Sequence, residues 1–127
     1  MKKFFSFVII ICGMMITACN SQSNKTMDPK EFSEKIKADS TLLVDVRTPE
    51  EYKEGHLKGA LLINYHDSTF AQQVARLDKN KTAYVYCRSG KRSAAAQEIM
   101  LKQGFQNVIN LDGGIVAWEK AALPVEK

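Results

Sequence analysis

One cysteine stands where its thiol could act as a nucleophile. Cys87 follows a β-like run at residues 82–86 and precedes a helix-like run at residues 94–100. Backbone N–H groups at a strand-to-helix turn point inward, and the helix N-terminus adds partial positive charge. The same turn contributes three cations, Arg88, Lys91 and Arg92. Because this setting favours an anion, we predict that Cys87 ionises below the ~8.5 of an ordinary cysteine and reacts as a thiolate.

The segments around this turn alternate between strand and helix patterns. Short apolar runs predict strands at residues 42–46, 61–64, 82–86 and 108–111, and helices are expected at residues 28–38, 51–54, 67–77, 93–102 and 115–121. This alternation predicts an α/β fold with a parallel sheet flanked by helices on both faces. Ligands bind at the carboxyl ends of strands in such folds, and Cys87 lies at such an end.

Length and composition indicate one globular domain. The chain has 127 residues, of which 45% are hydrophobic and 25% are charged. Its formal net charge of +4 falls to +2 without Lys2 and Lys3, and no Lys/Arg tract points to nucleic acid. The three cysteines, Cys12, Cys19 and Cys87, lack Cys-x-x-Cys spacing and have no histidine at ligand spacing. We therefore expect no nucleic-acid partner and no metal site.

The first 26 residues have the pattern of an export signal and a tether. Residues 1–18 resemble a secretory signal peptide, with two lysines before an apolar core. The Ile-Thr-Ala-Cys sequence ending at Cys19 resembles a bacterial lipoprotein signal, which implies cleavage before Cys19 and its acylation; the alternative is an uncleaved anchor helix. Residues 19–26 then form a lipidated, flexible tether. We expect a protein exported and anchored in a membrane by lipid, facing the periplasm or the cell exterior, with Cys87 as its free thiol.

Four segments together resemble the signatures of a single-domain rhodanese. They are Asp-Val-Arg at 45–47, Glu-Gly-His-Leu-Lys-Gly-Ala at 54–60, Cys-Arg-Ser-Gly-Lys-Arg-Ser at 87–93 and Leu-Asp-Gly-Gly-Ile-Val-Ala-Trp at 111–118. The resemblance implies a rhodanese-like domain over residues 27–127, with a five-stranded parallel sheet. It also implies a sulfurtransferase that moves a sulfane sulfur from thiosulfate or a similar donor to a thiol or cyanide through a Cys87 persulfide, and that needs no organic cofactor.

The loop after Cys87 is then the predicted substrate site. Its N–H groups are expected to hold the outer sulfur, and its cations an anionic donor. The predicted substrate-binding residues are Arg88, Ser89, Gly90, Lys91, Arg92 and Ser93. Gly90 would turn backbone N–H groups inward, and Ser93 would either cap the helix or donate to the sulfur. Asp45 and Arg47 are predicted to support the site as an ion pair beside the loop, with a purely structural pair as the alternative.

Other interpretations of the same residues stay open. Dual-specificity cell-cycle phosphatases have a cysteine loop on this fold, but they need an arginine six positions after the cysteine, where this chain has Ser93. A non-enzymatic sulfur carrier or redox-partner binding module would use the same frame without turnover. His56 is expected to support a loop rather than act as a base, and Trp118 to lie in the core. We expect a monomer whose partners are a small-molecule sulfur donor and a thiol acceptor.

Overall fold

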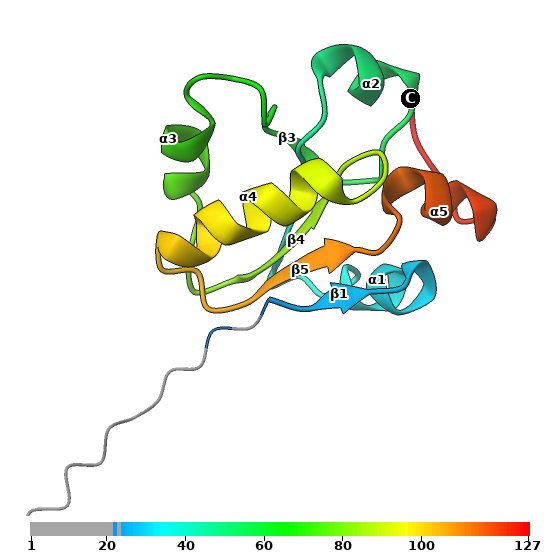
Figure 1. The fold of residues 1–127 in the computed structure, drawn as a ribbon. Coiled ribbons are helices and arrows are strands. Elements are labelled where there is room, and N and C mark those ends of the chain that lie inside the picture. Colours follow the sequence, from blue (N-terminus) through cyan, green and yellow to red (C-terminus); the bar gives the residue numbers. More distant parts are fainter. Residues whose placement is uncertain (1–21, 23) are drawn as a thin grey trace, which may run out of the picture.

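A five-stranded parallel sheet forms the centre of the molecule (Figure 1). The computed structural model describes residues 22 and 24–127, so the predicted signal peptide and Cys19 lie outside the described residues. The strands are β1 (Thr26–Met27), β2 (Thr41–Asp45), β3 (Leu61–Leu62), β4 (Thr82–Tyr86) and β5 (Val108–Leu111). They lie in the order β1-β5-β4-β2-β3, and each neighbouring pair is parallel. The predicted α/β class and parallel sheet are confirmed.

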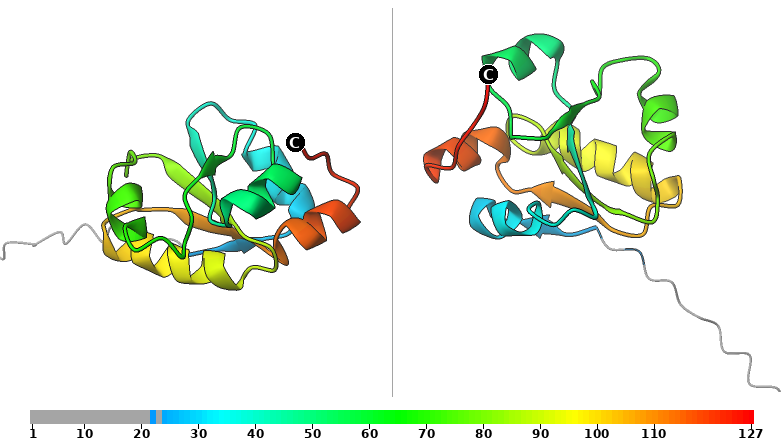
Figure 2. Two further views of the ribbon diagram at one scale, coloured as in Figure 1. Left: turned by 90° about the horizontal axis from the view of Figure 1, so that it is seen from above. Right: turned by 180° about the vertical axis from the view of Figure 1, so that it is seen from behind.

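Helices cover both faces of this sheet, as Figure 2 shows. They are α1 (Pro29–Lys35), α2 (Pro49–Glu54), α3 (Phe70–Ala75), α4 (Lys91–Lys102) and α5 (Gly114–Lys120). Helices α3 and α4 pack on one face, where Phe70, Val74 and Met100 meet the valines of β2 and β4. Helices α1 and α5 pack on the other, where Phe32 and Trp118 lie against the tyrosines of β4. The core position predicted for Trp118 is confirmed, since it is 4% exposed.

The fifth strand lies across the boundary predicted between the tether and the domain. Thr26 and Met27 pair with Asn110 and Leu111 at the edge of β5. The Lys25 carbonyl also accepts a hydrogen bond from the Asn110 N–H at 2.9 Å. Thr26 is therefore part of the sheet, although the sequence pattern places it in the tether. The polar residues before Met27 show no apolar pattern, and β1 exists because β5 offers a free row of backbone groups.

Local capping explains where the helices begin. The Asp28 side chain accepts from the Glu31 N–H before α1, and Thr48 and Glu51 form a reciprocal capping box before α2. Helix α3 is shorter than the expected 67–77, because the Asp67 side chain accepts from the Thr69 N–H at 2.9 Å and forms a separate turn. Within residues 22 and 24–127, none of the helices has the length and apolar character needed to cross a bilayer.

Candidate active site

The loop between β4 and α4 carries Cys87 at the carboxyl end of the sheet. Gly90 closes the loop with φ 103°, a left-handed conformation that other residues rarely adopt, directly before α4. Helix α5 holds the loop from its other side. The Ile115 N–H donates to the Cys87 carbonyl at 2.9 Å, and the Val116 N–H donates to the Arg88 carbonyl at 3.2 Å. The first turns of α4 and α5 thus fix the backbone around the thiol.

Gly114 permits this close docking of α5. A Cβ atom added at position 114 would collide with the Arg88 carbonyl and with the Cys87 carbonyl. Gly114 also has φ +61°, which disfavours a side chain. Gly114 therefore allows α5 to pack closely against the back of the reactive loop.

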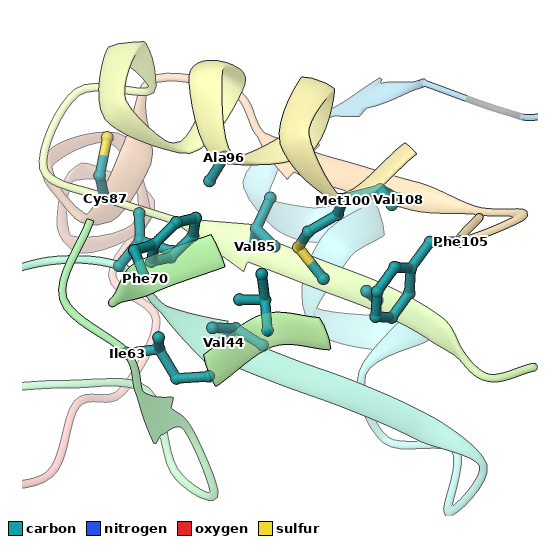
Figure 3. Packing of buried hydrophobic residues seen from close by; sticks show 12 residues of the cluster. Val44, Ile63, Phe70, Val85, Cys87, Ala96, Met100, Phe105 and Val108 are labelled. Atoms are coloured by element: carbon teal, nitrogen blue, oxygen red, sulfur yellow. The ribbon is translucent and has the colours of Figure 1, made fainter. Parts of the chain in front are cut away.

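Two donors point at the Cys87 sulfur. The Gly90 N–H lies 3.1 Å from Sγ, and the Ser93 hydroxyl lies 3.3 Å from it. Burial raises the pKa of the thiol, since Cys87 exposes only 1% of its surface. Hydrogen bonds from the Ser93 hydroxyl and from the N–H groups of Ser93, Gly90 and Ser89 outweigh burial, so the pKa of Cys87 is lowered. Figure 3 shows Cys87 at one end of the apolar cluster, near the start of α4.

The three cations of the loop have different surroundings. Arg92 forms a two-pronged ion pair with Glu51 of α2, with N–O distances of 2.8 and 2.9 Å. The hydrogen bonds from Arg92 lower the pKa of Glu51 to about 2, and Glu51 raises the pKa of Arg92. Arg88 and Lys91 are exposed, and Arg88 lines a polar cavity of about 210 Å³ that carboxylates of α2 and α5 also line. Among the described residues, Gly90 and Ser93 donate hydrogen bonds to Sγ, and the side chains of these three cations donate none.

Asn110 links this loop to β5. Its Oδ1 accepts from the Ser93 hydroxyl at 2.7 Å, and its Nδ2 donates to the Gly90 carbonyl at 3.1 Å. Asn110 is only 6% exposed, so both of its polar atoms need partners inside the protein. Reasoning from sequence missed this residue. The available signal was a lone amide inside the apolar run of β5, which indicates a buried polar contact.

A second polar network lies on the other face of β4. The Asp45 carboxylate, 0% exposed, accepts from the Arg47 guanidinium at 2.7–3.1 Å and from the Tyr86 hydroxyl at 2.7 Å. Arg47 also donates to the Gly55 carbonyl at 2.7 Å, and the Tyr86 hydroxyl accepts from the Leu57 N–H at 3.1 Å. Burial acts to lower the pKa of Arg47, but hydrogen bonds and charge from Asp45 outweigh it and raise that pKa. Burial also raises the pKa of Tyr86.

Comparison with known proteins identifies the domain that carries this loop. The rhodanese-like domain family matches residues 28–121. A protein of Allochromatium vinosum named "Sulfurtransferase" is 35% identical over 100 residues, which cover 78% of this chain and 92% of that protein.

The chain belongs to the rhodanese-like family. The crystal structure of a rhodanese-like domain protein from Staphylococcus aureus matches with a TM-score of 0.68 and 30% identity, covering 81% of this chain and 99% of that one. The "Putative sulfur carrier protein YrkF" of Bacillus subtilis is 34% identical over 100 residues, covering 78% of this chain and 53% of that protein. Some relatives are far longer, and the chain spans only 29% of the length of two mycobacterial proteins that it matches at 36% identity.

The rhodanese-like fold places the predicted residues in different positions relative to the sulfur. Ser93 does not cap α4 with its side chain; it lies between the sulfur and Asn110. Asp45 and Arg47 form the predicted ion pair, and they hold the backbone at Gly55 rather than the sulfur. His56 stacks on the Tyr52 ring and its Nδ1 lies 2.9 Å from the Tyr52 carbonyl, so it supports this same segment.

The loop is suited to nucleophilic sulfur chemistry. A thiol of lowered pKa lies beside N–H groups that can stabilise a second negative atom. Within the described part of the chain, no group of three or more His, Cys, Asp or Glu side chains is placed to bind a metal ion.

Proposed function

We propose that the protein transfers a sulfane sulfur through a persulfide on Cys87. The Cys87 thiolate attacks the outer sulfur of a donor such as thiosulfate. A new S–S bond forms, the S–S bond of the donor breaks, and sulfite leaves with that bond's electron pair. An acceptor thiolate then attacks the outer sulfur of the persulfide, takes it as its own persulfide and returns Cys87 as a thiolate. Two separate half-reactions predict ping-pong kinetics.

The observation that supports this proposal most strongly is the set of donors around Sγ. The N–H of Gly90 and the hydroxyl of Ser93 favour the thiolate before the reaction. The N–H groups of Ser89, Gly90 and Ser93, which face the sulfur, would hold the negative outer sulfur after it, as an oxyanion hole holds oxygen. Arg88 and Lys91 are exposed cations at this loop, and they would attract an anionic donor.

Mass spectrometry tests the first half-reaction directly. The reduced protein is treated with thiosulfate, and the peptide that contains Cys87 should gain the mass of one sulfur atom. Cyanide or an added thiol should then remove that mass, while the Cys87→Ser variant should gain none. Uptake without release to any thiol or cyanide would indicate a sulfur carrier instead of a transferase, and no uptake from a panel of donors would refute both.

The ion pair of Arg92 argues against phosphate chemistry. A phosphatase loop uses an arginine to grip the phosphoryl oxygens with two hydrogen bonds. Here both terminal nitrogens of the Arg92 guanidinium donate to Glu51, and the position six after the cysteine is Ser93. We expect hydrolysis of an aryl phosphate to be no faster than in the Cys87→Ser control. Clear turnover above that control would favour the phosphatase instead.

We also propose that Cys19 carries lipid and holds the domain at a membrane. The Gln22 amide donates to the Leu101 and Phe105 carbonyls at 2.6 and 2.9 Å, at the end of α4 away from Cys87. A lipid three residues earlier would therefore leave the reactive loop facing away from the membrane. Cells fed a labelled fatty acid should label the wild type and not Cys19→Ser. Equal labelling of both proteins would refute the anchor without affecting the sulfur chemistry.

A further inference from the structure

Cys87 and three other residues form a closed ring of hydrogen bonds that includes the sulfur. The Gly90 N–H and the Ser93 hydroxyl approach Cys87 Sγ, and Asn110 joins the same two residues from behind. Ser93 is 0% exposed and Asn110 is 6% exposed, so water has little access to either side chain. The ring therefore has to satisfy its hydrogen bonds from its own atoms.

The direction of the Asn110 amide is fixed by the backbone. The Gly90 carbonyl accepts hydrogen bonds only, so the Asn110 NH₂ group has to face it. This leaves the amide oxygen, also an acceptor only, facing Ser93 at 2.7 Å. The Ser93 hydroxyl carries one hydrogen and lies between two acceptors, the Asn110 oxygen and the sulfur at 3.3 Å. It can donate to one of them at a time.

The ionisation state of the sulfur decides between these two acceptors. A neutral thiol can donate its own hydrogen to the Ser93 oxygen while Ser93 donates to Asn110. A thiolate has no hydrogen to donate and can only accept one. Since hydrogen bonds to a charged acceptor are about twice as strong as neutral ones, the Ser93 hydroxyl then donates to the sulfur. We propose that Asn110 is a positioning residue for Cys87, which holds the Ser93 hydroxyl hydrogen while the sulfur is a thiol and releases it to the sulfur when the thiolate forms.

Asn110 would thus have two separable effects on the site. Its NH₂ group holds the Gly90 carbonyl, and through the shared peptide plane it orients the Lys91 N–H. Its oxygen competes with the thiolate for the Ser93 hydrogen and so keeps the sulfur less acidic than Ser93 alone would make it. A thiol of higher pKa gives a more nucleophilic thiolate, whereas a thiol of lower pKa leaves faster, and attack is fastest when the pKa lies near ambient pH.

Charged groups on the elements around Cys87 also influence the pKa of its thiol. Arg92 on α4 lies close enough for its charge to interact with Cys87, and it is paired with Glu51 of α2. Arg88 and Lys91 on the loop and Asp112 after β5 are exposed. The elements on the α3 side contribute apolar residues to the cluster around Cys87, such as Phe70 and Ile63. None of these groups changes when Asn110 is replaced, so a titration can isolate its effect.

The experiment titrates Cys87 in the full chain, by following its alkylation by iodoacetamide against pH and reading the Cys87 peptide by mass spectrometry. Asn110→Ala should lower the pKa of Cys87 by about one unit, a tenfold rise in the thiolate-to-thiol ratio, because Ser93 then donates to sulfur alone. In a Ser93→Ala background the same substitution should no longer lower the pKa, because the hydrogen for which Asn110 and the sulfur compete is absent. Asn107→Ala, at the other end of β5 and exposed, is the matched control.

A second substitution keeps the test decisive if Asn110→Ala folds poorly. Asn110→Asp preserves an acceptor for Ser93, adds a negative charge and sets an acceptor against the Gly90 carbonyl, so it should raise the pKa of Cys87. Opposite shifts from Ala and Asp, with the Ala effect dependent on Ser93, support the proposal. A merely structural role predicts lower stability with no shift, and either that result or a downward Ala shift that survives in Ser93→Ala would overturn it. The kinetic consequence rests on the proposed function, whereas the titration does not require sulfur transfer.

Discussion

Tyr86 and Cys87 are neighbours in the chain, yet they belong to two different buried networks. Successive residues of a strand point to opposite faces of the sheet, so Tyr86 joins the cluster under α1 and α5 while Cys87 joins the cluster under α3 and α4. We call Asp45, Arg47 and Tyr86 the carboxylate network, and Cys87, Gly90, Ser93 and Asn110 the sulfur network.

The two networks differ in charge and in how fully they are satisfied. The Asp45 carboxylate accepts five hydrogen bonds, and its negative charge is matched by Arg47. In the sulfur network a single Ser93 hydrogen lies between two acceptors, and no ion pair is formed by its four members. The saturated network fixes the backbone behind the site. In the sulfur network, which lacks a hydrogen for one of its two acceptors, the charge of the sulfur can change, as the proposed reaction requires.

Removing the cation of the carboxylate network should have the largest effect. Arg47→Met leaves the Asp45 carboxylate at 0% exposure without a positive partner. Breaking a buried ion pair in this way costs about 3–5 kcal/mol of unfolding free energy. The pKa of Cys87 should not change measurably, because Arg47 lies on the opposite face of β4. Urea denaturation measures the first quantity and the alkylation rate of Cys87 against pH measures the second.

The matched control for this change is Lys53→Met on α2. Lys53 is exposed, so its replacement should alter the unfolding free energy by less than about 0.5 kcal/mol. If Arg47→Met shifted the titration of Cys87 as strongly as Asn110→Ala, the two networks would be one coupled system. The contrast between a structural face and a chemical face would then be wrong.

The sulfur network should make the free energy of unfolding depend on pH. The pKa of Cys87 is lowered in the folded state, so the unfolded chain binds more protons between the two pKa values. The stabilisation from the thiolate is therefore full above the unfolded value of ~8.5 and is lost as pH falls through the folded pKa. Each unit between the two values contributes ~1.4 kcal/mol.

The comparison of wild type with Cys87→Ser measures this contribution. The difference between their unfolding free energies should grow from below the folded pKa up to about pH 8.5 and then level off. Sulfur uptake from thiosulfate should rise over the same lower range, since the thiolate is the attacking species. A stability difference that stays flat with pH would mean that the hydrogen bonds at Sγ do not favour the thiolate.

The sheet could be predicted from the sequence wherever the strands are apolar. The segments 82–86 and 108–111 coincide with β4 and β5, and 42–46 differs from β2 by one residue. β1 could not be predicted in this way, because two residues after a polar stretch carry no period. They are a strand only because they pair with Asn110 and Leu111.

The site, like the sheet, could be predicted where its residues are contiguous in the chain and not where they are distant in sequence. Cys87 and its loop are contiguous in the chain, so their residue types and the turn from strand to helix identify them. The partners of the loop are distant in sequence: Glu51 binds Arg92 across 41 positions, and Asn110 binds Ser93 across 17. A local pattern carries no information on such contacts. The sequence therefore indicates three available cations, whereas the fold engages Arg92 in an ion pair with α2.

Breaking the Arg92–Glu51 ion pair should have the smallest effect, and it tests whether the sulfur network includes α2. Glu51→Gln removes one charge while a glutamine can still complete the capping box of α2. Because both side chains are about one-fifth to one-quarter exposed, with 21% for Arg92 and 24% for Glu51, the loss should be about 1 kcal/mol or less at pH 7. The pKa of Glu51 is lowered from 4.5 to about 2, so this contribution is complete above 4.5 and fades as pH falls toward about 2.

The same substitution should act on the sulfur through charge alone. Arg92 interacts with Cys87 electrostatically, and without Glu51 its positive charge is less neutralised. Uptake of sulfur from thiosulfate should therefore rise about two- to threefold at low ionic strength, and the gain should disappear in high salt. Glu50→Gln, an exposed neighbour on α2, should leave the rate unchanged. Slower uptake in Glu51→Gln would mean that the site needs Arg92 held in place more than it needs its charge, and the sulfur network would then extend to α2.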